Sequence, residues 1–506
     1  MKIVVGYPPT FSEKGTVLLS QNRQLQWFNN PTFLFPVTLG TAATWLRNKG
    51  HQVFWKDAIA ENLSMEEFIS FLKTEQPDLF FFESKSPVIK KHWAIIDLLK
   101  KEVPHMKIGL CGDHVSYLPR ESMENSTVDY VFNGGYYDFA MVELVDAIVE
   151  GKKPPVGVWY RENGNIVDNG RYNFTRHLDE APIIDRVFTK NDLYQKEFNL
   201  KGRPFAYIMS GRDCWYGKCT FCVWDHTLYP KGTFRARTPE NVMEEVKYLV
   251  DKIGVKEIFD DAGTITVGPW LRKFCNLMIE SGYNEKVMYS CNMRFGAVTP
   301  QEYKLMKRAG FRLLKYGLEG GTQQTLDKLD KGTKIEEIIP SARAAKAAGL
   351  TVHLTMMVGY PWETRDDAMA TLNLAKELMH QGYADILQST VVMPYPGTPL
   401  YKEASEKGWL LIDQYDYERL DMTEPILATP YVSREEIMKI CDRIYTDIFF
   451  NPKYVYQHLK KIKSWEDIVY TARGVKAVLG HVKDFSRPVA ETKTENRATA
   501  ATAMKF

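Results

Sequence analysis

Three cysteines stand close together in the segment S-G-R-D-C-W-Y-G-K-C-T-F-C-V-W, residues 210 to 224, directly after an apolar run that predicts a strand. Cys214, Cys219 and Cys222 supply soft, anionic sulfur, which suits an iron–sulfur cluster or zinc. Because the segment offers only three cysteines, one metal position would stay open, and open positions are where bound metals do chemistry. The alternative is a structural zinc site with His226 as the fourth ligand.

The composition narrows the class of protein. The chain has 506 residues and a formal net charge of +2, which gives no support for nucleic-acid binding. Its seven cysteines, most of them scattered, do not form a disulfide framework, so we expect a reducing, cytoplasmic location. No stretch of about 18 or more apolar residues predicts a transmembrane segment. The strand-like start K-I-V-V-G-Y has no signal-peptide pattern.

Two series of β-α units must position the cysteine segment. Residues 1–150 alternate short apolar runs with helical periods, which predicts a doubly wound, Rossmann-like parallel sheet. Residues 201–430 continue with six further units, which predicts a partial (β/α)6 TIM-type barrel. The cysteines follow the first barrel strand, at the edge where such barrels place their chemistry. The expected barrel strands cover residues 205–209, 257–261, 287–292, 313–319, 352–359 and 386–393.

The remaining segments have weaker patterns. Residues 151–200 are interpreted as a connecting segment with a small hairpin, because they contain the turn-prone R-E-N-G-N-I-V-D-N-G. Residues 431–486 predict a C-terminal helical cap. Residues 487–506 lack large apolar residues at any period, which predicts a disordered tail.

The cysteine segment resembles the loop of the radical S-adenosylmethionine (SAM) enzymes, whose three cysteines hold a [4Fe-4S] cluster and leave one iron for SAM. The resemblance implies an anaerobic enzyme in which one electron cleaves SAM to a 5′-deoxyadenosyl radical. The family usually has three residues between the first two cysteines, whereas this chain has four, Trp215 to Lys218. Hydrogen abstraction by the radical needs no general base, so no catalytic residue is predicted.

Further segments resemble the SAM contacts of that family, each at the carboxyl end of an expected strand. Y-G-L-E-G-G places Glu319 where a carboxylate accepts from the ribose hydroxyls, and M-V-G-Y-P-W-E-T places Gly359 beside adenine. The other implied contacts are Phe221 against adenine, Asp260 and Asp261 at the methionine amino group, and Ser290 and Arg294 at its carboxylate. The alternatives are that Asp260 and Asp261 belong to a solvated loop and that Arg294 is a surface residue.

Residues 1–150 resemble the cobalamin-binding domain that precedes the radical domain in one branch of this family. The segments are residues 35–53, 109–119 and 128–135, whose glycines at strand ends let backbone approach a large cofactor. Asp113 and His114 are adjacent, so the cobalt-ligating D-x-H-x-x-G loop is missing. This implies either base-off cobalamin or a domain that holds none. The implied cobalamin contacts are Thr38, Leu39, Gly40, Ser84, Gly112, Asp113 and Gly134.

The combined prediction is a cobalamin-dependent methyltransferase that acts on an unactivated carbon of a small-molecule substrate. An electron donor such as flavodoxin or ferredoxin would reduce the cluster. The lysine-rich region from 450 to 485 interleaves apolar residues and would suit a hydrophobic substrate, although a plain helical cap is the alternative. Two rival functions stay open: a non-methylating relative, such as an oxidative cyclase or a lipid- or tetrapyrrole-modifying enzyme, and a non-catalytic metal-binding sensor.

Overall fold

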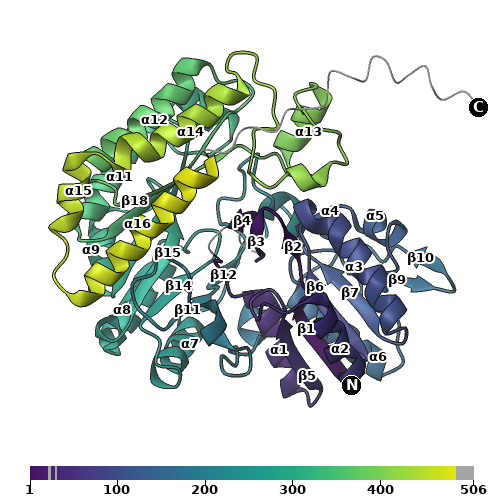
Figure 1. Ribbon diagram of the computed structural model, residues 1–506. Coiled ribbons are helices and arrows are strands. Elements are labelled where there is room, and N and C mark those ends of the chain that lie inside the picture. The colour runs from purple at the N-terminus through teal and green to yellow at the C-terminus, as the bar shows by residue number, and fades with distance from the viewer. Residues whose placement is uncertain (21–23, 29–30, 486–506) are drawn as a thin grey trace, which may run out of the picture.

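The computed structural model describes residues 1–20, 24–28 and 31–485. It is a mixed α/β fold in which two parallel sheets lie in separate halves of the molecule, each with helices packed around it (Figure 1). Within these residues, no helix combines the length and the apolar character that a membrane crossing needs. The predicted tail, residues 487–506, lies outside the described residues.

The N-terminal sheet has seven strands in the order β10-β9-β8-β7-β6-β1-β5. The strands from β5 to β8 are parallel, and the hairpin predicted after residue 150 continues the sheet as the antiparallel strands β9 and β10. The strand order reverses between β1 and β6, and the carboxyl ends at such a reversal flank a ligand crevice. The strands are β1 (Lys2–Tyr7), β5 (Gln52–Asp57), β6 (Leu79–Glu83), β7 (Lys107–Cys111), β8 (Tyr130–Phe132), β9 (Val158–Glu162) and β10 (Asn165–Val167).

Helices cross over between these strands. Ser64 starts one of them with a capping box, because its side chain accepts from the Glu67 amide while Glu67 accepts from the Ser64 amide. A small antiparallel sheet, which the sequence did not predict, interrupts the series near the N-terminus. The helices are α1 (Val37–Asn48), α2 (Met65–Glu75), η1 (Ser86–Val88), α3 (Ile89–Glu102), α4 (Asp113–Tyr117), α5 (Pro119–Glu124) and α6 (Tyr137–Val149), and the small sheet comprises β2 (Phe11–Ser12), β3 (Gly15–Leu18) and β4 (Gln26–Phe28).

The second sheet has six parallel strands in chain order, and each one coincides with an expected strand. Parallel strands buried on both faces consist of nearly continuous apolar runs, which explains why the sequence located them. Their carboxyl ends meet at one edge. The strands are β11 (Phe205–Ile208), β14 (Glu257–Asp260), β15 (Met288–Met293), β16 (Phe311–Glu319), β17 (Thr351–Val358) and β18 (Ile386–Val391).

Side chains cap several of the helices between these strands. Thr238 caps α7 and Thr364 caps α12, whereas Lys334 stands at the N-cap of α11. The helices are α7 (Pro239–Asp251), α8 (Pro269–Glu280), η5 (Tyr283–Glu285), α9 (Pro300–Arg308), α10 (Gln323–Lys328), α11 (Ile335–Ala347), α12 (Arg365–His380) and α13 (Pro399–Glu406).

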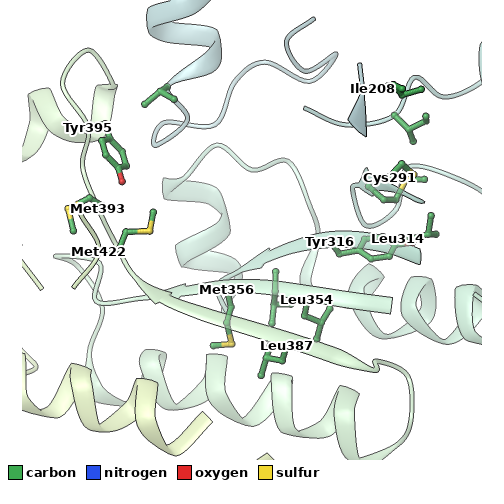
Figure 2. Packing of buried hydrophobic residues seen from close by; sticks show 14 of the residues in the cluster. Ile208, Cys291, Leu314, Tyr316, Leu354, Met356, Leu387, Met393, Tyr395 and Met422 are labelled. Atoms are coloured by element: carbon green, nitrogen blue, oxygen red, sulfur yellow. The ribbon is translucent and has the colours of Figure 1, made fainter. Parts of the chain in front are cut away.

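Apolar side chains of the second sheet form its core. Figure 2 shows Ile208, Cys291, Leu314 and Leu354 among the packed strands, and all four are fully buried. Burying an aliphatic side chain of this size contributes about 1.5–3 kcal/mol. This core holds the strand ends, and therefore the loops after them, in fixed positions.

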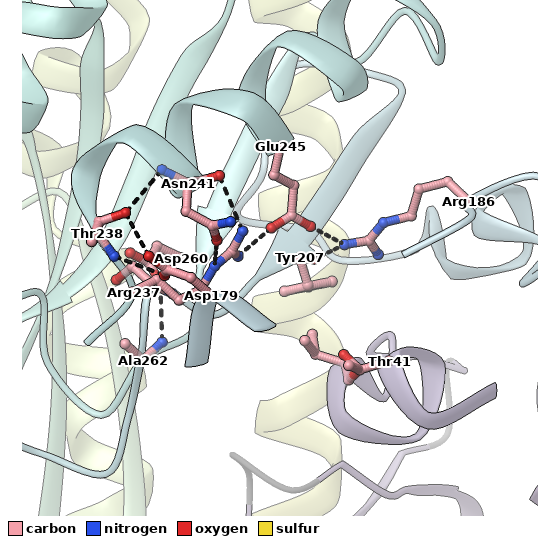
Figure 3. A network of polar contacts seen from close by, with 12 residues as sticks. Thr41, Asp179, Arg186, Tyr207, Arg237, Thr238, Asn241, Glu245, Asp260 and Ala262 are labelled. Carbon is pink, nitrogen blue, oxygen red and sulfur yellow. Dashed lines mark hydrogen bonds and ion pairs between the residues drawn. The ribbon is translucent and has the colours of Figure 1, made fainter. Parts of the chain in front are cut away.

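The segment 151–200 ties the two halves together through a buried polar network (Figure 3). Arg186 lies over the Phe35 ring of the N-terminal half, 4.4 Å from its centroid, and donates to Glu245 of α7 at 3.3 Å. Arg237 also donates to Glu245. The segment includes the short helices η2 (Leu178–Glu180) and η3 (Asn191–Tyr194). The segment 151–200 therefore packs between the two sheets and contacts both.

Three helices follow the second sheet: α14 (Arg434–Phe449), α15 (Pro452–Leu459) and α16 (Trp465–Phe485). Helix α14 packs on β18, where the Ser389 amide donates to the Tyr445 hydroxyl at 3.1 Å. Several apolar side chains of α15 and α16 are exposed, among them Tyr456, Leu459 and Trp465. In Figure 1, the yellow helix α16 runs from the outer side of the second sheet toward the middle of the molecule.

Candidate cluster and cofactor site

The three cysteines lie on the loop between two short strands, β12 (Gly211–Arg212) and β13 (Arg235–Ala236), which also contains the π-helix η4 (Trp224–Leu228). Gly217, one of the four residues between Cys214 and Cys219, has a left-handed φ of +59°. Backbone amides of Gly217 and Tyr216 donate to the Cys214 sulfur, and the Trp224 amide donates to the Cys222 sulfur. Burial raises the pKa of Cys214 to about 11, and these amides oppose that rise by stabilising the thiolate. The donor set therefore fits a metal that binds thiolates.

Neighbouring strand ends hold this loop. The Thr220 amide donates to the Leu329 carbonyl at 3.0 Å, and the Leu400 amide donates to the Thr220 carbonyl at 3.0 Å. Gly263, after β14, approaches so closely that a β-carbon there would lie 2.9 Å from the Asp213 carbonyl and 3.1 Å from the Cys214 β-carbon. The glycine of F-D-D-A-G-T is thus explained by packing against the cysteine loop.

The zinc alternative finds no support in this geometry. Within the described residues, no three His, Cys, Asp or Glu side chains surround a single-ion position. His226 is occupied elsewhere, because its Nε2 atom lies 3.2 Å from the Cys219 carbonyl. A [4Fe-4S] cluster distributes its cysteine ligands over several iron atoms, and the three sulfurs fit that group.

All three cysteines line one cavity of about 790 Å³. The predicted contacts Phe221, Arg294 and Glu319 line the same cavity, so the structure brings together the cysteines and three of the seven predicted SAM positions. Its volume is in the range of small-molecule and cofactor pockets. The cavity extends to Phe28 and Leu34 in the N-terminal half of the molecule.

Glu319 is held by a buried ion pair that the sequence did not predict. It follows a β-bulge at the end of β16 and has a φ of +61°, an uncommon conformation for a residue other than glycine. Lys331 Nζ lies 2.9 Å from Glu319 Oε1, and both side chains are about 10% exposed. Arg294 donates to the Lys331 carbonyl and lies over the Tyr216 ring, 3.7 Å from its centroid. Lys331 could not be recognised from the sequence, because no local pattern sets it apart from other lysines.

Four predicted SAM residues do not line this cavity. Asp260 is buried and accepts from the Ser210 and Ala262 amides and from the Tyr289 hydroxyl. Asp261 accepts from the Asn292 side chain at 3.3 Å, and Ser290 donates to Glu257 at 2.7 Å. Gly359 lies against Ile437 of α14. Asp260, Asp261 and Gly359 stand at the carboxyl ends of their strands, as expected, whereas Ser290 lies in the middle of β15 and its hydroxyl turns to Glu257 at the amino end of β14. Their contacts with SAM stay predictions.

The predicted cobalamin residues collect at the carboxyl edge of the N-terminal sheet. Ser84 follows β6 at the strand-order reversal, and its hydroxyl lies 2.7 Å from His92 Nδ1. Gly112 has a φ of +121°, and a β-carbon there would lie 2.0 Å from the Ser84 carbonyl. Asp113 lies 3.3 Å from Lys85 Nζ, and the Gly134 amide donates to Ser116 at 3.1 Å. Thr38, Leu39 and Gly40 form the buried first turn of α1, where the Gly40 α-carbon faces the Phe35 ring.

This edge retains polar atoms that could serve a bound group. The Tyr395 hydroxyl is buried and has no hydrogen-bond partner among the described residues, and neither has Asn133 Oδ1 just after β8. Tyr395 belongs to the loop after β18 and lies near Asp113, whose charge contributes to raising its pKa. Buried polar atoms without partners are costly, so this edge is compatible with a polar cofactor.

Comparison with known proteins agrees with this site. Residues 208–375 match the Radical SAM superfamily. An uncharacterized methyltransferase of Pyrococcus horikoshii is 25% identical over 462 residues, which cover 91% of this chain and 95% of the relative. The anaerobic magnesium-protoporphyrin IX monomethyl ester cyclase of Cereibacter sphaeroides is 24% identical over 393 residues, with 76% of this chain and 61% of that protein covered.

Solved structures share the whole fold. The radical SAM methyltransferase TsrM of Kitasatospora setae, solved with cobalamin and a [4Fe-4S] cluster, superposes with a TM-score of 0.67 at 13% identity and covers 96% of this chain and 99% of that one. The cobalamin-dependent SAM radical enzyme OxsB, with aqua-cobalamin and SAM bound, gives 0.67 at 16% identity, covering 90% and 70%.

The cysteine loop at the strand ends and the family match together define a radical SAM domain. The protein is a radical SAM enzyme, as the three-cysteine segment predicted. Such an enzyme binds a [4Fe-4S] cluster and SAM, and the residues that line the cavity fit both.

Proposed function

We propose that the protein is a cobalamin-dependent radical SAM methyltransferase that methylates an unactivated carbon of a small molecule. The observation that carries the proposal is the shared cavity, in which the cysteine loop of one half faces Phe28 and Leu34 of the other half. A substrate between two cofactors needs such a space. The methyltransferase relative of similar length and the shared fold with TsrM support the proposal.

Different residues of the chain would bind the cluster, SAM and cobalamin. Cys214, Cys219 and Cys222 would hold the cluster, and Phe221, Arg294 and Glu319 would contact SAM. Asp260 and Asp261 would contact the methionine amino group, Ser290 the methionine carboxylate and Gly359 adenine. When bound, the cluster would supply the electron that cleaves SAM, and cobalamin would supply the methyl group. The proposed cobalamin contacts are Thr38, Leu39, Gly40, Ser84, Gly112, Asp113 and Gly134.

At the SAM end of the cavity, Arg294 and Lys331 supply two cations, and Glu319 and Asp225 supply two carboxyl groups. Burial lowers the pKa of a lysine, but the Glu319 carboxylate beside it raises that of Lys331, so the ammonium stays charged. The Arg294 guanidinium would bind the methionine carboxylate through a charge-assisted pair of hydrogen bonds. Glu319 would accept from the ribose hydroxyls while Lys331 holds its carboxylate in place.

The two halves of the molecule would have different roles in this enzyme. The N-terminal sheet would be the cobalamin-binding domain and the second sheet the partial barrel. A flavodoxin or ferredoxin would reduce the cluster. The seven cysteines are all free thiols, which supports a reducing, cytoplasmic location for the enzyme.

The experiment is anaerobic purification and cluster reconstitution, followed by incubation with dithionite and methyl-labelled SAM. We expect iron and cobalamin to copurify and SAM to yield both 5′-deoxyadenosine and S-adenosylhomocysteine. A Cys219→Ser variant should yield neither product, while the core variant Cys275→Ser should yield both. If wild-type protein with a full cluster forms no 5′-deoxyadenosine, the proposed function is wrong.

A second function is favoured by the similarity to the cyclase of Cereibacter sphaeroides. A non-methylating enzyme would use the same cysteine loop to form the radical but would transfer no methyl group. It would therefore release 5′-deoxyadenosine without S-adenosylhomocysteine. The same labelled-SAM experiment separates the two functions.

A further inference from the structure

The cavity described above continues beyond the cofactor positions toward a group of cations. Arg203 precedes β11, at its amino end, whereas Cys214 follows its carboxyl end, and both line the cavity. A strand of this length spans about 13 Å, at ~3.3 Å per residue. Arg473 of α16 joins the same wall. The cavity therefore connects the cysteine loop with two guanidinium groups near the opposite strand end.

Neither guanidinium is neutralised within the described residues. Arg473 Nε and Nη1 are buried without a hydrogen-bond partner there, and its Nη2 atom makes only a long contact of 3.4 Å with the Lys201 carbonyl. Arg203 donates to the Glu197 carbonyl at 3.0 Å. Neither arginine forms an ion pair in the described part of the chain. Arg203 is exposed, so water can complete its hydrogen bonds. Burying a charged donor without an acceptor is costly, so a missing acceptor is the simplest explanation for the buried Arg473 nitrogens.

The charge around the two arginines is positive. Burial and the nearby Arg473 both lower the pKa of Arg203, as expected where like charges face each other. Lys196 and Lys476 line the same wall. Two carboxylates lie near this end. Glu197 accepts from the Tyr207 hydroxyl at 3.3 Å. The buried Glu257, whose charge acts on both arginines, is paired with Arg312. An anionic group between the arginines would relieve the repulsion.

The cavity between its two ends is lined by apolar and polar side chains. Lys315, Thr355, Gln388 and Thr390 come from within the strands of the second sheet. The apolar members come from both halves of the molecule and from the loop before the second sheet, and they are Leu18, Phe28, Phe198, Met293, Met356 and Met422. Methionine side chains adapt to irregular apolar ligands, so this stretch suits an extended hydrocarbon or ring system.

We propose that the substrate is an acidic amphiphile, whose carboxylate or phosphate group is bound by Arg203 and Arg473 and whose apolar body lies along the cavity toward the cysteine loop. This inference names a substrate class for the proposed function and rests on it. Two guanidinium forks can give an oxyanion up to four N–H donors in fixed directions, which lysines cannot provide. The anionic end would fix which carbon of the body reaches the SAM site.

Ligand-induced stabilisation of the anaerobic, cluster-reconstituted full chain tests this site. The probes are octyl phosphate, octanoate and the neutral octanol, each titrated while the thermal unfolding midpoint is followed. We expect one or both anions to raise the midpoint and octanol to leave it unchanged. Arg473→Gln and Arg203→Gln should each weaken anion binding by about tenfold or more, because each removes charge-assisted hydrogen bonds. The exposed Lys453→Gln on α15 is the matched control and should bind like wild type.

The outcomes separate the sources and the hypotheses. Binding of octanoate alone identifies a carboxylate substrate, and binding of octyl phosphate alone identifies a phosphate. Anion binding that is equal in wild type and both arginine variants overturns the inference, as does stabilisation by octanol alone. If Arg473→Gln unfolds, Arg473→Lys replaces it in the test. Lysine keeps the positive charge but lacks the paired N–H donors of the guanidinium, so this variant should bind the anion with intermediate affinity. 5′-Deoxyadenosine formation is measured in the same samples, so its loss with intact anion binding would count against the proposed function only.

Discussion

Lys331 Nζ and Glu319 Oε1 lie 2.9 Å apart, in a space that exists because residue 317 is a glycine. A β-carbon at Gly317 would lie 2.2 Å from Glu319 Oε1 and 2.8 Å from Lys331 Nζ. The first glycine of Y-G-L-E-G-G therefore leaves room for the ion pair rather than for a turn. The pair in turn orients the carboxylate that we assign to the ribose of SAM.

Gly317→Ala should displace this ion pair without unfolding the sheet, because the colliding atoms are the ends of flexible side chains. We expect the Kd for SAM to rise by about tenfold, the cost of roughly one charge-assisted hydrogen bond. Anaerobic isothermal titration calorimetry measures it. Gly474→Ala is the matched control, since a β-carbon at Gly474 meets nothing within 4 Å. Equal SAM affinity in wild type and Gly317→Ala would contradict this role.

Cys222→Ser should abolish cluster binding, because the hydroxyl replaces one of three thiolate ligands and hard oxygen suits iron–sulfur clusters poorly. Reconstituted protein should lose the iron–sulfur absorbance near 400 nm and most of its bound iron. Cys441→Ser is the comparison, since Cys441 is a buried core residue on α14 and should leave the iron content unchanged. Iron retention in Cys222→Ser would remove this cysteine from the ligand set.

Much of the framework could be predicted from the sequence, for physical reasons. The six strands of the second sheet are mostly buried, so apolar residues dominate most of them, although β16 and β18 carry polar residues at half-buried positions. The cysteine spacing revealed the loop because all three ligands are close in sequence. Glu319 was found through the resemblance of Y-G-L-E-G-G to a family motif, and the structure shows that Gly317 in this segment leaves room for its ion pair.

Other parts of the site depend on contacts that leave no local pattern. Strands β2, β3 and β4 are two to four residues long, too short for a recognisable period. Lys331 reaches the cavity from the loop after α10, and Arg473 reaches it from α16 through tertiary packing. Asp260 stands at the predicted strand end, but its side chain turns to Tyr289, and Ser290 lies in the middle of β15 with its side chain on Glu257. Side-chain direction at the end of a strand is set by these neighbours.

Glu363 should make stability depend on pH. Burial raises the pKa of Glu363 to about 7 from 4.5, although Thr325 and the Gly359 and Tyr360 amides donate to it. A carboxyl with a raised folded-state pKa contributes stability that is complete below pH 4.5 and lost as the pH rises through 7. The loss amounts to about 3 kcal/mol at ~1.4 kcal/mol per pKa unit.

Thermal unfolding of wild type and Glu363→Gln between pH 5 and about 8 measures the contribution of Glu363 ionisation to stability. The amide cannot ionise, so the unfolding midpoint of the variant should fall less than that of wild type as the pH rises. The comparison is between the two proteins at each pH, which cancels the other titrating groups. Parallel midpoint curves would show that Glu363 ionises normally.

Arg212 and Asp138 join the cysteine loop to the N-terminal half. Arg212 of β12 donates to Asp138 of α6 at 2.6 and 3.3 Å, and both side chains are buried. Asp138→Ala should destabilise the protein by about 3–5 kcal/mol, because it leaves the Arg212 charge buried without a partner. Arg272→Ala, which removes the exposed pair with Glu302, should cost less than ~1 kcal/mol. Urea unfolding followed by tryptophan fluorescence measures both free energies of unfolding.

The same contact should affect the cluster, because Arg212 lies two residues before Cys214. We expect Asp138→Ala to lower the iron content of the reconstituted protein. Normal iron retention would show that the cysteine loop does not need this contact.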